Sequence, residues 1–182
     1  MSVKALIPTY NIVQQTWQTI MNISASSSDA LLAAYTGRVK YDNNNFTSVS
    51  GGTKIRITFA SGTSGTWNTS AVTVGNQSSA GSYNSTATPT AVTFSGGSGG
   101  FSLSANQTIL SDEITFSWDN TKGLVIASYG NSGTQTYSNP ASVGTAGHGY
   151  TSGDNTASAT PTVTTTDTTS KSAGIIKIEV YA

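Results

Sequence analysis

The central part of the chain alternates apolar and polar residues in short runs. In the run from Lys54 to Phe59, the apolar residues Ile55, Ile57 and Phe59 occupy every second position. Successive side chains of a β-strand point to opposite sides of its sheet, so alternation buries one side and leaves the other in water. This run therefore predicts a half-buried strand.

Further apolar runs follow, and each is bounded by Gly, Asn, Ser or Pro, which favour turns. The strands predicted in the central part are 53–60, 71–75, 91–95, 101–104, 109–118 and 124–129. Turn signals about ten residues apart are typical of a β-sandwich. We therefore predict an all-β fold, an antiparallel and jelly-roll-like β-sandwich.

The two ends of the chain and one long segment complete the prediction. Further strands are expected over 12–23, 38–41, 46–49 and 173–181. A short helix is predicted near 28–36, because Ser28 and Asp29 can cap the run Ala-Leu-Leu-Ala-Ala and Gly37 can end it. The segment 130–160 has little periodicity and is interpreted as a long loop, a feature that is often functional.

Composition and charge exclude several classes of function. Charged residues make up 9% of the chain and the net charge is +0, where a charged share of roughly a quarter is usual. No basic patch for nucleic acid or for a membrane surface is therefore expected. The absence of cysteine excludes disulfides and cysteine metal sites.

The sequence also carries hints about location. The N-terminus lacks the apolar run of a signal peptide, and no segment approaches the ~20 apolar residues of a membrane helix. A soluble protein made in the cytoplasm is expected. The charge-poor surface rich in Thr, Ser, Gly and Asn is nevertheless typical of extracellular bacterial and viral surface proteins. A bacteriophage virion protein, released by lysis, satisfies both expectations.

Several motifs share their order and spacing with a known domain. They are Gly52–Phe59 with Arg56, Ala91–Gly97, Ile109–Ile114, Leu124–Tyr129 and His148. Together they resemble the accessory β-sandwich domain that precedes the catalytic domain in some SGNH/GDSL-type hydrolases. The resemblance covers residues 46 to about 162 and implies a sandwich fold. That family's catalytic domain carries a Gly-Asp-Ser block and an Asp-x-x-His pair, and this sequence contains neither.

Candidate catalytic residues are few. Gly96–Gly100 satisfies the pattern G-x-S-x-G around Ser98, but the predicted strand that follows takes the place of the helix that a nucleophile elbow needs. His148 is the only histidine, so any serine triad would require it. Asp112 and Glu113 are adjacent and would point to opposite faces of a strand. We therefore expect a protein that is not an enzyme.

Metal and cofactor sites are not expected either. Asp119, Asp154 and Asp167 could contribute ligands to calcium, but their spacing matches no EF-hand or calcium repeat. A lone histidine within Gly147–Tyr150 is more often a packing residue than a metal ligand.

Glycan binding has a more specific basis in this sequence. Aromatic rings stack on the apolar faces of sugars, while amides and hydroxyls bind the sugar hydroxyls. The candidate ligand-binding residues are Trp67, Tyr83, Tyr137, His148, Tyr150 and Asp154, accompanied by the amides of Asn131, Gln135, Asn139 and Asn155. The alternative is that these aromatics cap the ends of the sandwich. Trp17 and Trp118 are expected in the core.

Two hypotheses about function follow. The first is a non-enzymatic protein on a virion surface, either a capsid decoration protein or a fibre or receptor-binding component of a tailed phage. Residues 1–45 would be a docking or oligomerisation arm, and residues 46–182 the sandwich domain. Its partners would be capsid or tail proteins and its own copies, as in a trimer. The second is a stand-alone extracellular carbohydrate-binding module that binds a cell-surface glycan.

Overall fold

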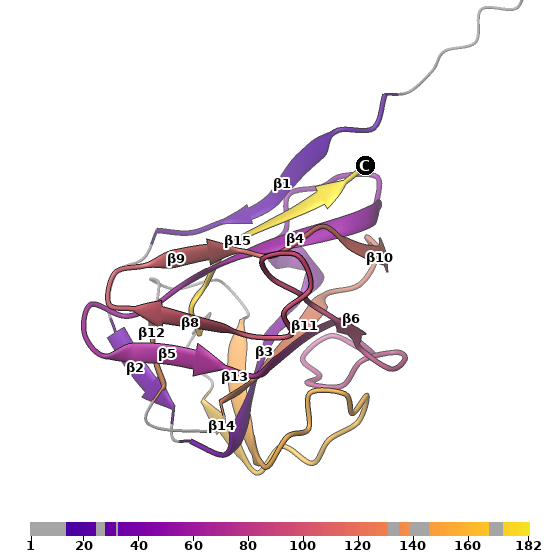
Figure 1. Cartoon of the computed structure of the whole chain (residues 1–182). Helices are drawn as coiled ribbons and strands as arrows, with labels where there is room; N and C mark the ends of the chain where they lie inside the picture. The colour runs from indigo at the N-terminus through magenta and orange to yellow at the C-terminus, as the bar shows by residue number, and fades with distance from the viewer. Residues whose placement is uncertain (1–13, 25–27, 32, 131–134, 139–145, 168–172) are drawn as a thin grey trace, which may run out of the picture.

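The computed structural model describes residues 14–24, 28–31, 33–130, 135–138, 146–167 and 173–182 (Figure 1). All strand pairs among these residues are antiparallel. The only helical element in these ranges is a single 3-10 turn, Asn43–Asn45. The predicted fold class is confirmed, since the protein is all-β with antiparallel sheets packed together.

A five-stranded sheet forms one side of the molecule. Its strands, in spatial order, are β1 (Trp17–Asn22), β15 (Ile175–Tyr181), β4 (Gly52–Ala60) and β10 (Ile114–Trp118), with β9 (Thr108–Leu110) also paired to β4. β9 and β10 pair with successive parts of β4, which therefore lies at the centre of the sheet.

The second sheet has six strands. They are β14 (Thr165–Asp167), β13 (Gly147–Ser152), β3 (Tyr35–Tyr41), β11 (Leu124–Gly130), β6 (Ala71–Asn76) and β7 (Thr90–Ala91). Two small sheets complete the fold and pair β2 (Ser28–Leu31) with β12 (Gln135–Ser138), and β5 (Thr66–Thr69) with β8 (Phe101–Ser104).

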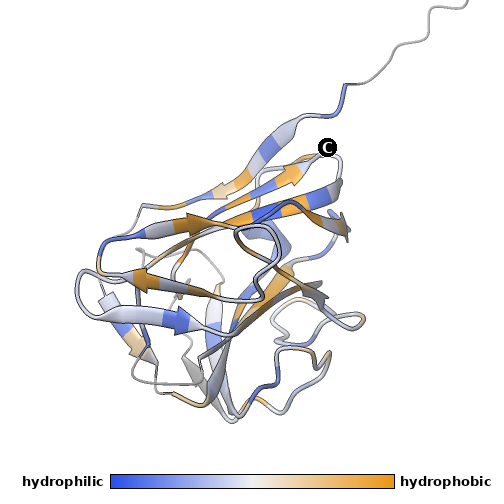
Figure 2. Ribbon diagram, viewed as in Figure 1, coloured by the Kyte–Doolittle hydropathy of each residue, from blue (hydrophilic) through white to orange (hydrophobic). Residues whose placement is uncertain are grey.

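The core contains apolar side chains from both main sheets. Ile55, Ile57 and Phe59 are buried, as their alternation predicts, and Val39 and Ile126 of the six-stranded sheet belong to the same cluster. Figure 2 shows hydrophobic and hydrophilic residues alternating along β4. Full burial of an aliphatic or aromatic side chain stabilises a fold by roughly 2 kcal/mol, so this cluster is the main source of stability.

Most strands with strong alternation are confirmed. The predictions 53–60, 71–75, 101–104, 124–129 and 173–181 correspond to β4, β6, β8, β11 and β15. The prediction 38–41 is part of the longer strand β3, and β1 covers residues 17–22 of the prediction 12–23. Residues 12 and 13 lie outside the described part of the chain.

The predicted helix near 28–36 is wrong. Residues 28–31 form β2, which pairs with β12 so that Ala30 faces Thr136. A turn follows, in which Ala34 adopts a left-handed conformation with φ 62, and β3 then begins at Tyr35. Helix propensity is a weak preference that tertiary pairing overrides, and here β12 supplies the pairing partner.

Three other predictions need correction. Residues 46–49 form no strand, and the prediction 91–95 is a strand only at 90–91 before a tight turn joins Phe94 to Ser98. The prediction 109–118 is two strands, because at the break the Ser111 hydroxyl accepts a hydrogen bond from the Ile57 backbone N–H at 2.9 Å. The expected loop 130–160 contains β12 and β13.

The described residues before position 46 contribute a strand to each main sheet and β2 to a small one. β3 lies between β13 and β11, and β1 pairs with β15. The predicted docking or oligomerisation arm, residues 1–45, stays a prediction, and its residues 1–13 lie outside the described ranges. Within those ranges, no helix has the length and apolar character needed to cross a membrane.

Candidate functional site

Four of the six residues predicted to bind a glycan lie in one row of rings. The ring centroids of Trp67 and Tyr137 are 5.8 Å apart, those of Tyr137 and His148 are 5.7 Å apart, and those of His148 and Tyr150 are 4.2 Å apart. Trp67, Tyr137 and His148 are only 3%, 2% and 1% exposed, and Tyr150 is half-buried. Three of the four rings therefore offer no open face on which a sugar could stack.

The environment of His148 is a tyrosine cluster. The hydroxyls of Tyr150 and Tyr137 lie 2.9 and 3.3 Å from its Nδ1. The hydroxyl of Ser98 donates instead to the carbonyl of Gly100 at 2.8 Å within its own turn. No hydrogen bond joins Ser98 to His148, so the geometry does not assemble the serine and histidine of a triad.

Tyr83 and Asp154 lie apart from this row. The Tyr83 ring lies over two glycines of β13, where a Cβ on Gly147 would come within 2.7 Å of its hydroxyl and one on Gly149 within 3.1 Å of a ring carbon. The exposed Asp154 carboxylate accepts hydrogen bonds from the hydroxyl and N–H of Thr156, at 2.7 and 3.1 Å. The six candidates therefore do not form a single site.

The accompanying amides do not create one either. Gln135 is buried, and its side-chain oxygen accepts a hydrogen bond from the Asn68 N–H at 2.6 Å. The Asn155 side chain donates to the carbonyl of Ser152 at 2.7 Å. Asn131 and Asn139 lie outside the described residues.

A buried arginine holds the loops beside Tyr83. Arg38 is 0% exposed and donates hydrogen bonds to the carbonyls of Tyr83 and Asn155, at 3.2 and 2.9 Å, and to that of Ser158. Burial lowers the pKa of Arg38 to about 10, so the side chain stays charged at neutral pH. This arrangement fixes two loops on the six-stranded sheet and presents no free polar group to a ligand in solution.

The remaining acidic candidates have local structural partners. Asp112 accepts hydrogen bonds from Gly96, Thr93 and Gly97, at 3.0, 2.8 and 2.9 Å, and these bonds lower its pKa. Asp119 is bonded to the hydroxyl of Thr121 at 2.6 Å. Across the described ranges, no three His, Asp or Glu residues gather where they could hold a metal ion. The side chain of Asp167 lies outside what the structure describes.

A different surface combines aromatic and charged side chains. We define the outer face as the side of the five-stranded sheet turned away from the core. The strand register aligns Trp17, Tyr181 and Lys54 in one row across β1, β15 and β4. It aligns Glu179 with Arg56 in the next row. An antiparallel sheet can leave one face in water in this way.

Arg56 is the centre of the outer face. Its guanidinium lies 4.3 Å from the ring centroid of Trp17 and makes two hydrogen bonds to the Glu179 carboxylate, at 2.9 and 3.2 Å. Lys177 donates to the same carboxylate at 2.8 Å. Burial raises the pKa of Glu179, and the bonds and charges of Arg56 and Lys177 outweigh this effect, leaving the pKa below its usual value.

Two more contacts extend the outer face to its margins. Lys54 lies 5.5 Å from the ring centroid of Tyr181 and bonds Glu113 at 3.0 Å. At the far side of β4, Leu110 pairs with Thr58 and is 45% exposed. Leu110 is the one large hydrophobic residue that stays exposed in the described ranges. The outer face is therefore flanked by apolar groups with a fixed ionic network between them.

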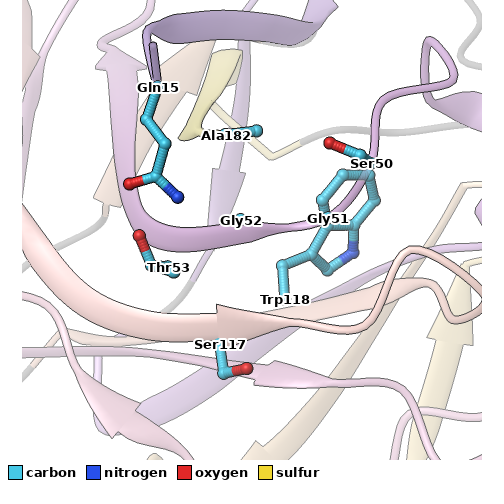
Figure 3. A pocket seen from close by; sticks show the side chains of 8 residues that line it. All are labelled: Gln15, Ser50, Gly51, Gly52, Thr53, Ser117, Trp118 and Ala182. Carbon is cyan, nitrogen blue, oxygen red and sulfur yellow. The ribbon is translucent and has the colours of Figure 1, made fainter. Parts of the chain in front are cut away.

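A pocket opens at one end of the same sheet (Figure 3). Its volume is about 450 Å³. It is lined by Gln15, Ser50, Gly51, Gly52, Thr53, Ser117, Trp118 and Ala182. The indole N–H of Trp118 donates to the Lys122 carbonyl at 3.3 Å, and the side chain is only 4% exposed. The lining side chains that the structure describes include no carboxylate, imidazole or amine.

Sequence reasoning missed the outer face as a candidate site. Trp118 is in the core as predicted, whereas the prediction that Trp17 is a core residue is wrong, because Trp17 is half-buried on the outer face. The available signal was the alternation itself. It places Lys54 and Arg56 on the face of β4 that points away from the core. It places Lys177 and Glu179 on the same face of the closing strand.

Comparison with known proteins does not assign this chain to a family. No protein-family model matches this chain, and no curated protein matches it. The resemblance to the accessory domain of SGNH/GDSL-type hydrolases therefore stays a prediction, although the all-β sandwich that it implies is the fold of this protein.

Proposed function

We propose that this chain is a non-catalytic component of a virion surface, a capsid decoration protein or a fibre or receptor-binding component of a tailed phage. In this proposal, its capsid or tail partner binds the outer face of the five-stranded sheet. The observation that carries the proposal is the combination of Trp17, Arg56, Tyr181 and Leu110 on one solvent-facing surface.

The residue types on the outer face are those that dominate protein interfaces. Trp, Tyr and Arg are enriched among the residues that contribute most to binding, and they act when a partner excludes water from them. Here Glu179 already holds Arg56 in place through two hydrogen bonds. A partner therefore meets a preorganised side chain, which reduces the entropy lost on binding.

The accessible acids and the serine candidate support a non-catalytic role. Asp119 and Asp154 accept hydrogen bonds within their own turns, and the Ser98 hydroxyl donates to its own turn. Asp112 accepts hydrogen bonds from the backbone of Gly96 and Gly97, in the turn that follows Phe94. His148 is buried against tyrosine hydroxyls. A reaction would require an acid or base that reaches a bound substrate, so the internal hydrogen bonds of these groups support the non-catalytic role.

A stand-alone carbohydrate-binding module, acting outside the cell, is the second candidate. It is favoured by one observation, the contact between the half-buried rings of Trp17 and Tyr181, whose centroids are 5.5 Å apart. Aromatic rings beside polar donors suit the two faces of a sugar. In this proposal the glycan binds the outer face and not the loop residues that the sequence analysis selected.

The direct test measures binding of purified protein to particles that lack it. Particles would be prepared from a phage strain in which this gene is deleted, and bound protein measured after density-gradient sedimentation. We expect the wild-type chain to sediment with the particles, and Trp17→Ala to bind about tenfold more weakly or worse, because a buried interface tryptophan typically contributes more than 1.4 kcal/mol.

Tyr129→Ala is the matched control. Tyr129 is half-buried on β11 in the other sheet, so its loss should leave particle binding unchanged. A wild-type chain that never sediments with particles would contradict the virion role. Retention on a polysaccharide column that disappears in Trp17→Ala would then favour the carbohydrate-binding module instead.

A further inference from the structure

The strand β1 lies at an edge of the five-stranded sheet (Figure 1). Just before β1, Thr16 and Ala182 exchange two backbone hydrogen bonds, at 2.8 and 3.1 Å. Bonded and non-bonded pairs alternate along an antiparallel ladder, so Gln18 bonds β15 while Trp17 and Thr19 do not. The N–H and C=O groups of Trp17 and Thr19 therefore point away from β15, toward the open edge.

Among the residues that the structure describes, none gives this edge the usual protection against strand pairing. Proteins guard exposed edges with charged residues, proline or covering segments, and β1 has the uncharged sequence Trp-Gln-Thr-Ile-Met-Asn. The loop at Thr47 covers only the carbonyl of Ile20, with a hydrogen bond of 2.9 Å. The open part of the edge is therefore the short stretch from Trp17 to Thr19.

The opposite edge of the same sheet is guarded. The side chain of Asn76 donates to the Ser117 carbonyl at 2.9 Å and accepts from the Asp119 N–H at 3.0 Å. These bonds occupy backbone groups at the end of β10. In the six-stranded sheet, the edge strand β7 has only two residues. Of the edges compared, β1 is the one suited to accept another strand.

We propose that β1 pairs with β1 of a second copy of this chain, in antiparallel orientation across a two-fold axis at Gln18. In this register, Trp17 of each copy exchanges both backbone hydrogen bonds with Thr19 of the other. The outward peptide groups of both strands are then satisfied reciprocally, as a self-complementary interface requires. The two five-stranded sheets join into one continuous sheet.

Charge and side-chain placement favour a second copy as the occupant. β1 carries no charge and the whole chain has net charge +0, so two copies do not repel each other. Trp17 and Thr19 both project on the outer face, so the pairing places the indole of one copy beside Thr19 of the other. This inference goes beyond the proposed function and does not depend on it.

A single cysteine at the two-fold axis tests the register. The chain has no cysteine, so Gln18→Cys introduces the only thiol. In a non-bonded antiparallel pair the two Cα atoms lie about 4.5 Å apart, which is within disulfide range. We expect oxidised Gln18→Cys to run as a covalent dimer on a non-reducing gel. The control Ser102→Cys, at an exposed position of β8, should stay monomeric.

A proline substitution tests the backbone bonds. Thr19→Pro removes an outward N–H and leaves the β1–β15 hydrogen bonds intact, a position where an edge strand tolerates proline. We expect the wild-type chain to dimerise in sedimentation velocity as its concentration rises, and Thr19→Pro to stay monomeric with an unchanged circular dichroism spectrum. If Thr19→Pro unfolds, the cysteine result decides. Wild-type protein that is monomeric throughout or trimeric, or Gln18→Cys that does not cross-link, would overturn the proposal.

Discussion

At the scale of single residues, Arg38 shows how a charge is kept inside a protein with few charges. No ion pair joins Arg38 to an acid within the described ranges, and its Nε has no hydrogen-bond partner there. Three backbone carbonyls bind the rest of the guanidinium instead. Burial disfavours the charged form of Arg38 and therefore lowers its pKa. The hydrogen bonds of the same side chain fix two loops on the sheet.

Arg38→Lys tests this role. A lysine ammonium lacks the planar fork that reaches several carbonyls at once, so some of these buried acceptors would lose their donor. We expect the free energy of unfolding to fall by about 1–3 kcal/mol. Urea denaturation measures the change, and hydrogen exchange should accelerate in the loops around Tyr83 and Asn155. Unchanged stability and unchanged exchange would contradict the anchoring role.

The sequence identified aromatic residues that lie together in the fold, but it did not show that their side chains are buried. Trp67 and Tyr137 lie close together, as members of one site should, but short strands that the sequence did not reveal carry them into the core. β5 has only four residues, and β12 is polar apart from Tyr137. Neither provides enough alternation to show which side of a strand its aromatic residue takes.

At the scale of elements, the contact between β4 and β15 combines packing with an ionic network. Ile57 pairs with Ile178 on the core side, and Arg56 pairs with Glu179 on the outer face. Strong alternation made both strands predictable. The polar strands β12 and β13 were not predictable, because their pairing partners β2 and β3, rather than their own sequences, hold them in place.

The Glu179 network makes stability depend on pH. Because the folded pKa of Glu179 lies below its ordinary value of 4.5, the unfolded chain binds more protons in acid. The contribution of Glu179 is therefore complete above pH 4.5 and is lost as the pH falls through the folded pKa. Glu179→Gln should lower the free energy of unfolding at pH 7 by about 1–2 kcal/mol and flatten its decline in acid.

Glu113→Gln is the control for this prediction. Glu113 bonds Lys54, and its side chain is 53% exposed, so its loss should cost less than about 0.5 kcal/mol. Urea denaturation of both variants between pH 3 and 7 makes the comparison. If the two substitutions lowered the free energy of unfolding equally, the network around Arg56 would contribute no more to stability than an exposed ion pair.

At the scale of the whole molecule, the two-sheet architecture was predictable from the sequence and the outer face was not. Alternation and turn spacing are local properties, so they identify strands and a sandwich from sequence. The outer face depends on register, since it brings Trp17, Arg56 and Leu110 from distant positions onto one sheet. Register follows from tertiary pairing, which local patterns in one sequence do not reveal.

The proposed role of the outer face predicts that substitutions there affect binding and stability differently. Leu110 is largely in water, and Trp17 contributes only part of its surface to the protein's own packing. Substitutions there should weaken a partner's binding with little loss of stability, whereas substitutions of Ile57 or Phe59 should unfold the protein. This contrast is the expected signature of a surface that serves a partner.

Electron cryomicroscopy of the particle that carries this protein tests the central claim most directly. We predict density for the β-sandwich on the particle exterior, with the Trp17, Arg56 and Leu110 side of the five-stranded sheet against a capsid or tail protein. Particles without this chain, or a chain bound with its outer face entirely in solvent, would contradict the account.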